Sequence, residues 1–152
     1  MLSRKKRVLF VCIHNSARSQ IAEEFFNQMC GEEFQAESAG LTPGVLNPLA
    51  VEVLREAGID ISGKATQNAF DVVKRGEFFA YVITVCDAAS AERCPIFPGT
   101  TTRLHWSFPD PSSFEGTWDE KLEQTRDMRE VIRAQLEEFC GDVCKVPSLA
   151  AA

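Results

Sequence analysis

Histidine and tyrosine are scarce in this chain, and it has no long apolar run. Two of the 152 residues are histidine, one is tyrosine, and the six cysteines include no Cys-x2-Cys pair. Zinc centres need closely spaced cysteines and histidines, so a zinc cluster is not expected. No apolar stretch could cross a membrane. The short one after the basic residues 4–7 is interrupted at His14, so we interpret it as a strand and not as a signal peptide.

Composition favours one soluble globular domain. The chain is 45% hydrophobic and 25% charged, and its net charge is −6, which argues against nucleic acid or a membrane as a partner. We expect a monomer with a domain over residues 1–145 and a flexible tail over 146–152. Without an export signal, six cysteines suggest reactive thiols in the cytoplasm and not a secreted disulfide framework.

One stretch, residues 8–26, carries the chemistry. Four apolar residues predict a strand buried on both faces, and apolar positions from Ile21 to Met29 predict a helix. The loop between them collects backbone N–H groups and the positive end of the helix dipole, which is an oxyanion site. Cys12 opens this loop, where that field stabilises a thiolate. Arg18 adds a planar fork for two oxygens of a tetrahedral oxyanion.

Most cysteines after an apolar run are simply buried core residues. Here the small polar residues Asn15, Ser16 and Ser19 accompany Cys12 and Arg18 in a strand-to-helix turn. This combination favours a nucleophile that attacks the centre of a bound oxyanion.

The rest of the chain alternates strands with helices. Strands are predicted at 34–39, 79–85 and 102–106, and helices at 48–57 and 68–75. A capping box at Thr117 opens a long helix that Gly141 is expected to stop. The alternation predicts an α/β fold: a single domain with an open four-stranded parallel sheet and helices on both faces. Since ligands bind beyond the carboxyl ends of such strands, Cys12, Cys86 and Asp110 should share one rim.

A second informative stretch is Cys86–Cys94. Its interior is small and polar, which predicts weak attachment to the core and mobility. Such a segment can close a disulfide if it rearranges to bring the two Cα atoms within about 7 Å. The alternative for each cysteine, a buried structural role, is substantial for Cys94 beside Pro95.

Cys-x5-Arg after a buried strand resembles the loop of low-molecular-weight protein tyrosine phosphatases and of arsenate reductases with the same fold. The two cysteines after the third strand resemble the thioredoxin-coupled arsenate reductases, over about residues 8–139. The resemblance implies that Cys12 attacks arsenate and Arg18 clamps it. Cys86 then attacks the Cys12–arsenic adduct, which releases arsenite and leaves a Cys12–Cys86 disulfide. Cys94 next attacks Cys86, so that the oxidation passes to a Cys86–Cys94 disulfide.

The resemblance assigns further roles. Asp110, before Pro111, would be the general acid, Asn15 would hold the loop in shape, and Ser19 would hydrogen-bond the nucleophilic sulfur. The oxyanion-binding loop would comprise Ile13, His14, Asn15, Ser16, Ala17, Arg18 and Ser19. Potassium is implied near Asn15, Glu23 and Ser38. No tightly bound cofactor is expected, and the reductant is an external thiol. The Cys86–Cys94 spacing is one residue longer than the commonest pattern of the family. The choice between thioredoxin and glutaredoxin with glutathione therefore stays open.

Several points stay open. A phosphatase would use Cys12, Arg18 and Asp110 in the same roles, but it would need neither Cys86 nor Cys94. Serines follow Asp110-Pro111 where phosphatases tend to carry aromatic residues. A non-catalytic oxyanion or redox sensor would need a partner surface or an output domain, and the chain offers no room for a second domain. His14 either lines the mouth or points to solvent. Cys30 is expected to be structural. Cys140 and Cys144 either form a second relay or are packed residues at the end of the last helix.

Overall fold

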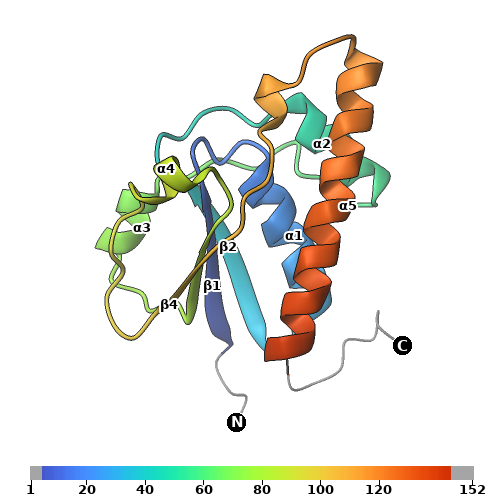
Figure 1. Cartoon of the computed structure of the whole chain (residues 1–152). Helices are drawn as coiled ribbons and strands as arrows, with labels where there is room; N and C mark the ends of the chain where they lie inside the picture. Colours follow the sequence, from blue (N-terminus) through green and yellow to red (C-terminus); the bar gives the residue numbers. More distant parts are fainter. Residues whose placement is uncertain (1–4, 145–152) are drawn as a thin grey trace.

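The computed structural model describes residues 5–144, so the predicted tail at 146–152 lies outside the described residues. Its centre is a four-stranded, all-parallel sheet in the order β2-β1-β3-β4 (Figure 1). The strands are β1 (Lys6–Cys12), β2 (Phe34–Gly40), β3 (Tyr81–Thr84) and β4 (Thr102–His105). The predicted open parallel sheet is therefore confirmed.

Helices cover both faces of this sheet (Figure 1). On one face, α1 (Arg18–Cys30) packs against α5 (Trp118–Val143), and α2 (Pro48–Glu56) packs on both. On the other face lies α3 (Ala69–Lys74), while the short α4 (Ala88–Ala91) follows β3 at the carboxyl edge. Among the described residues, no helix combines the length and apolarity needed to span a bilayer.

The central strand β1 feeds two separate cores because its side chains alternate between faces. Val8, Phe10 and Cys12 join the core beneath α1 and α5. Leu9 and Val11 join the core beneath α3. All five are buried, as the uninterrupted apolar run predicts for a strand covered on both sides.

Two helices differ from the sequence-based prediction. The Thr117–Glu120 capping box is present, but α5 continues through Gly141 to Val143. A glycine commonly ends a helix by adopting the left-handed conformation, and Gly141 is not among the glycines with positive φ, so the helix continues past it. The helix α4 was not predicted, because an apolar face is what such predictions detect and none of its residues is buried.

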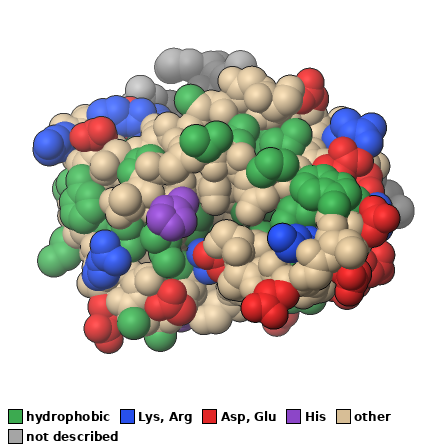
Figure 2. Space-filling model, turned by 90° about the horizontal axis from the view of Figure 1, so that it is seen from above, with side chains coloured by type: hydrophobic (Ala, Val, Ile, Leu, Met, Phe, Trp, Pro, Cys, Tyr) green, Lys and Arg blue, Asp and Glu red, His purple; other side chains and the backbone are tan. Residues whose placement is uncertain are grey.

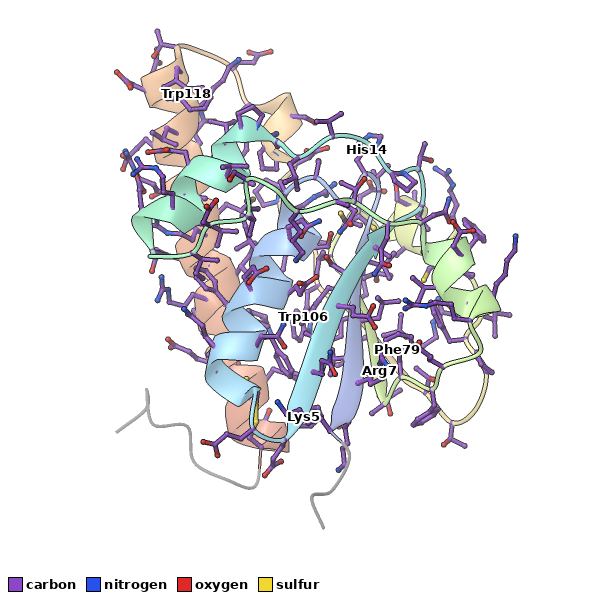
Figure 3. All side chains as sticks on the ribbon, turned by 180° about the vertical axis from the view of Figure 1, so that it is seen from behind. Lys5, Arg7, His14, Phe79, Trp106 and Trp118 are labelled. Carbon is purple, nitrogen blue, oxygen red and sulfur yellow. A yellow bond between two sulfur atoms is a disulfide. The ribbon has the colours of Figure 1, made fainter. Side chains whose placement is uncertain are left out.

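The cysteines also require a correction. Four are free thiols: Cys12, Cys86, Cys94 and Cys140. The other two, Cys30 and Cys144, form a disulfide across 114 residues of sequence. Figure 3 shows it as a yellow bond where the ends of α1 and α5 meet. The bond joins Cys30, at the end of α1, to Cys144, which follows α5. This pairing depends on how the two helices pack, which spacing alone does not reveal.

Candidate active site

The Cys12 thiol lies at the carboxyl end of β1 and is 2% exposed. Its Sγ is hydrogen-bonded to the Ser19 hydroxyl at 2.9 Å, the contact expected from the sequence. The backbone N–H of Asn15 also donates to Sγ, at 3.1 Å. Polar hydrogens directed at a buried sulfur stabilise its thiolate form, which is the nucleophile.

Asn15 holds the loop in shape, and its backbone has a positive φ of 55°. Asparagine tolerates this left-handed conformation better than most residues do. Its Nδ2 donates to Ser19 Oγ at 2.8 Å. Its Oδ1 accepts hydrogen bonds from Gln20 Nε2 at 3.1 Å and from the backbone N–H of Gln67 at 3.0 Å. All the polar atoms of this buried amide are thus engaged within the protein.

The start of the β2–α2 connection supports the loop from one side. Leu41 and Thr42 donate backbone hydrogen bonds to the carbonyls of Cys12 and Ile13, at 3.0 and 2.7 Å. Gly40 lies so close that a Cβ there would be 2.8 Å from backbone atoms of residues 13–15. The loop carbonyls therefore face β2 and the residues after it, which leaves loop N–H groups to face a ligand.

The N-terminus of α1 begins at the end of this loop. Its N-cap residue is Ala17, and no side chain caps the helix. The first backbone N–H groups of a helix have no partners within it, so an uncapped end carries partial positive charge that favours an oxyanion.

Arg18 and Asp110 meet at this site although 92 positions separate them. The Arg18 side chain is only 6% exposed, and its Nη2 lies 3.5 Å from Asp110 Oδ2. Its Nη1 donates to the Phe108 carbonyl at 3.3 Å. The other carboxylate oxygen of Asp110 accepts from the Ser112 N–H at 2.9 Å, at the start of the 3-10 turn η1 (Pro111–Ser113). Asp110 is 30% exposed, so it borders the guanidinium from the solvent side.

Cys86 is fully buried and belongs to the same core as Cys12. Burial raises the pKa of the Cys86 thiol to about 11, while the nearby Arg18 guanidinium lowers it and Cys12 raises it. The Val85 N–H donates to the Val11 carbonyl at 2.8 Å, so Cys86 and Cys12 each come directly after residues that are hydrogen-bonded to each other at the ends of the neighbouring strands β3 and β1.

Cys94 lies apart from this group. It is buried in the core on the opposite face, with Leu9 and Val11, and burial raises its pKa while Arg103 opposes the change. The sequence predicted a flexible link between Cys86 and Cys94. In the structure a short helix, α4, occupies that link and holds the two thiols in different cores.

His14 is exposed at the carboxyl edge of the sheet, as Figure 3 shows, and its Nδ1 is hydrogen-bonded to the Thr42 carbonyl at 2.9 Å. Figure 2 looks down on this face. A histidine lies near its centre, with basic and acidic side chains beside it.

The residues expected near potassium are already engaged. Ser38 Oγ donates to Glu23 Oε1 at 2.7 Å, and Lys64 Nζ forms an ion pair with Glu23 Oε2. Lys64 also reaches Glu24 Oε1 at 3.0 Å. Asn15 Oδ1 accepts two N–H groups and is not free for a cation. In the structure, the cation beside Glu23 is the Lys64 ammonium group.

Sequence reasoning missed several residues of the site. Gln20 and Gln67 orient Asn15, Lys64 neutralises Glu23, and Arg103 borders Cys94. Lys64 and Gln67 lie in the connection between α2 and α3, which carries no periodic pattern or motif. Only Gln20 stood in a recognised stretch, one residue after Ser19.

Comparison with known proteins agrees with this geometry. The family model described as low molecular weight phosphotyrosine protein phosphatase matches residues 7–146. An arsenate reductase of Shouchella clausii is 38% identical over 136 residues, which is 89% of this chain and 95% of that protein. The crystal structure of an Archaeoglobus fulgidus arsenate reductase is 30% identical, with a TM-score of 0.62 over 86% of this chain and 98% of that one. A Corynebacterium glutamicum thioredoxin-dependent arsenate reductase is 29% identical, with a TM-score of 0.60 over 91% of this chain and 65% of that one.

Proposed function

The chain belongs to the low molecular weight phosphotyrosine protein phosphatase family, and we propose that it is an arsenate reductase that converts arsenate to arsenite through a thiol relay. One observation carries this assignment within the family. A second buried thiol, Cys86, lies in the same core as Cys12 and follows β3, the strand that pairs with β1. A phosphatase needs only the first of these thiols.

In the first step, the Cys12 thiolate attacks the arsenic atom of bound arsenate. The Ser19 hydroxyl and the Asn15 N–H stabilise this thiolate. Arg18 holds two oxygens of the oxyanion, and its contact with Phe108 fixes its direction. Asp110, within 3.5 Å of Arg18, donates a proton to the departing hydroxide, which leaves as water. The product is a Cys12–arsenic(V) adduct.

In the second step, the Cys86 thiolate attacks Cys12 Sγ. The sulfur–arsenic bond breaks and its electron pair stays on arsenic, which leaves as arsenite, reduced from the pentavalent to the trivalent state. A Cys12–Cys86 disulfide remains, so two thiols have supplied two electrons. The raised pKa of Cys86 keeps it a neutral thiol at rest, and Arg18 is the group that favours its ionisation.

In the third step, Cys94 attacks Cys86 and frees Cys12, which leaves a Cys86–Cys94 disulfide for an external thiol reductant. Cys94 must leave the opposite core for this step, so α4 must unfold locally. Thioredoxin or glutaredoxin with glutathione can supply the electrons. Both work in the cytoplasm, where we propose that this enzyme acts as a monomer.

The cation beside the loop is supplied by the chain itself. We propose that the Lys64 ammonium takes the place expected for potassium, because it neutralises Glu23 while Asn15 Oδ1 is occupied. This removes the need for a bound metal ion at the loop.

Phosphoester hydrolysis through a cysteinyl-phosphate is the second candidate function. The family description and the shared Cys12, Arg18 and Asp110 favour it. It gives no role to the buried thiol beside Cys12.

A thiol count distinguishes the two functions. Protein whose Cys30–Cys144 disulfide is intact and whose other four cysteines are thiols receives one equivalent of arsenate, and new disulfides are mapped by peptide mass spectrometry. The relay predicts loss of two thiols, at Cys86 and Cys94, with one arsenite released. Unchanged thiols together with phosphoester hydrolysis would assign the protein to the phosphatases instead.

A further inference from the structure

Three cysteines gather at the end of the molecule opposite the oxyanion loop. Cys30 ends α1, Cys140 lies in the last turn of α5, and Cys144 follows that helix. Their sulfur atoms all lie within 4.8 Å of one another. The helix α1 is 13 residues long, which at about 1.5 Å per residue puts roughly 20 Å between this cluster and the Arg18 end. The catalytic relay therefore does not include these thiols.

Helix geometry explains why the three sulfurs converge. Cys140 and Cys144 are four residues apart, and the Cys144 N–H donates to the Cys140 carbonyl at 2.9 Å, so the last turn presents both on one face. That face packs on α1, where Cys30 is 3% exposed. Cys140 is 7% exposed and Cys144 is partly exposed, so a small molecule can reach the cluster beside Cys144.

The oxidation state decides whether the cluster can bind anything. In the structure Cys30 and Cys144 are joined as a disulfide, and Cys140 is a free thiol beside it. Two-electron reduction of this bond by an external dithiol, the class of reductant that serves the proposed relay, yields three adjacent thiols and oxidises the dithiol to a disulfide. Three sulfurs with no carboxylate or imidazole among them suit a soft, three-coordinate ion.

We propose that the reduced cluster of Cys30, Cys140 and Cys144 binds trivalent arsenic, the product of the proposed function on which this choice of ligand rests. Arsenous acid is neutral at neutral pH. Three As–O bonds break, three As–S bonds form, and the thiol protons leave with the hydroxyls as three waters. Arsenic stays trivalent and no electrons are exchanged.

Charge favours this ligand over a divalent metal. The carboxyl ends of α1 and α5 meet here, and their partial negative charge opposes the formation of thiolate anions. Three thiolates around Zn²⁺ would leave a net negative charge in this setting. Three thiols that condense with arsenous acid give a neutral product, so no charge is buried.

The test uses a protein that lacks the relay, so that it is independent of arsenate reduction. The variant Cys12→Ser/Cys86→Ser/Cys94→Ser keeps only the three clustered cysteines of the six in the chain. It is reduced with a phosphine, titrated with sodium arsenite, and examined by native mass spectrometry and by reaction with a thiol reagent. We expect one arsenic per chain, a mass gain of one arsenic less three hydrogens, and protection of all three thiols.

A matched variant carries Cys140→Ser in the same background. It leaves two thiols, and its affinity for arsenite should fall by more than the roughly 10–100-fold that loss of a supporting group costs a metal site. X-ray absorption should show three sulfur neighbours in the parent and fewer in this variant. Circular dichroism checks that both are folded.

Three results would overturn the proposal: no protection of thiols by arsenite, equal affinity with and without Cys140, or preferential binding of Zn²⁺ at equal concentration. The single change Cys140→Ser in the otherwise natural chain should leave arsenate turnover unchanged. If arsenite binds to the relay-free variant but the natural chain reduces no arsenate, then the proposed function fails and the binding site stands.

Discussion

Replacing Lys64 by methionine removes the only cation paired with Glu23 in the described residues. The Glu23 side chain is 12% exposed and Lys64 is 27% exposed, so the pair is mostly withdrawn from water. Removal of one partner from a fully buried pair costs about 3–5 kcal/mol. This pair is partly solvated, and Ser38 still donates to Glu23 in the variant. We therefore expect Lys64→Met to lower the free energy of unfolding by about 1–3 kcal/mol near neutral pH.

The penalty should depend on pH in a defined direction. Burial raises the pKa of Glu23, and Lys64 is the strongest influence that opposes it. Without Lys64 the folded-state pKa rises further above the unfolded value, so the folded protein binds a proton more tightly. The loss of stability in Lys64→Met is then fully present at pH values above the folded-state pKa of Glu23. It disappears at pH values below the unfolded-state pKa of Glu23. Each unit of that rise costs about 1.4 kcal/mol at high pH.

Urea denaturation of the natural chain and of Lys64→Met, at about pH 8 and about pH 5.5, measures this effect. We expect a larger difference between the two proteins at the higher pH. Glu23→Gln in the Lys64→Met background should remove the pH dependence. The exposed Lys74, changed to methionine, is the control for loss of a surface charge. A penalty that is equal at both pH values, or equal to that of Lys74→Met, would refute the pairing argument.

The same pair predicts the response to salt. If the Lys64 ammonium replaces potassium, arsenate turnover of the natural chain should be equal in potassium and sodium chloride at matched ionic strength. A severalfold activation that is specific to potassium would show that a metal ion still binds beside Asn15.

The remaining predictions concern the relay. Cys94→Ser should release one arsenite per chain and then stop with a Cys12–Cys86 disulfide, visible by peptide mapping; repeated turnover would exclude Cys94 as the resolving thiol. In that variant, arsenite release should rise with pH by up to about tenfold per unit between pH 7 and 9, because the pKa of Cys86 is about 11 and only its thiolate attacks. A rate of arsenite release that does not change with pH in rapid-quench measurements would show that ionisation of Cys86 does not limit that step. Arg18→Lys should lower kcat/KM for arsenate by roughly 100-fold or more, since a point charge cannot hold two oxygens; near-normal activity would contradict the clamp. Ser19→Ala removes a hydrogen bond to Cys12 Sγ and should slow single-turnover adduct formation by about tenfold, equivalent to about 1.4 kcal/mol. It also leaves the buried Asn15 Nδ2 without its acceptor, so the free energy of unfolding should fall by about 1–3 kcal/mol.

The sequence predicted those parts of the site that a short local pattern encodes. The apolar run of β1 and the turn from Cys12 to Arg18 form one continuous unit, and parallel topology brings Cys86 and Asp110 to its edge. It could not predict the support from Lys64 or Gln67. Their roles depend on where the connection between α2 and α3 crosses the loop, which only tertiary packing decides.

The cysteines show the same limit. Strand order placed Cys86 beside Cys12 correctly because both follow neighbouring parallel strands. Strand order did not predict on which face of the sheet Cys94 lies, since a short polar segment can leave the sheet on either side. The Cys30–Cys144 disulfide depends on the packing of α1 against α5 and on the continuation of α5 past Gly141 to Val143.

The separation of Cys86 from Cys94 explains why the segment between them is weakly built. The proposed relay must join these thiols during turnover, yet at rest β1 and its side chains lie between their two cores. The helix α4 has four residues, none of them buried, and its Asp87 cap is worth about 1 kcal/mol. A stable helix here would trap the oxidation at Cys12–Cys86. A disordered segment would expose Cys94 to oxidation before arsenate arrives. The structure lies between these limits: apolar burial protects Cys94 until the new disulfide at Cys86 gives it a target, and little secondary structure then opposes its release.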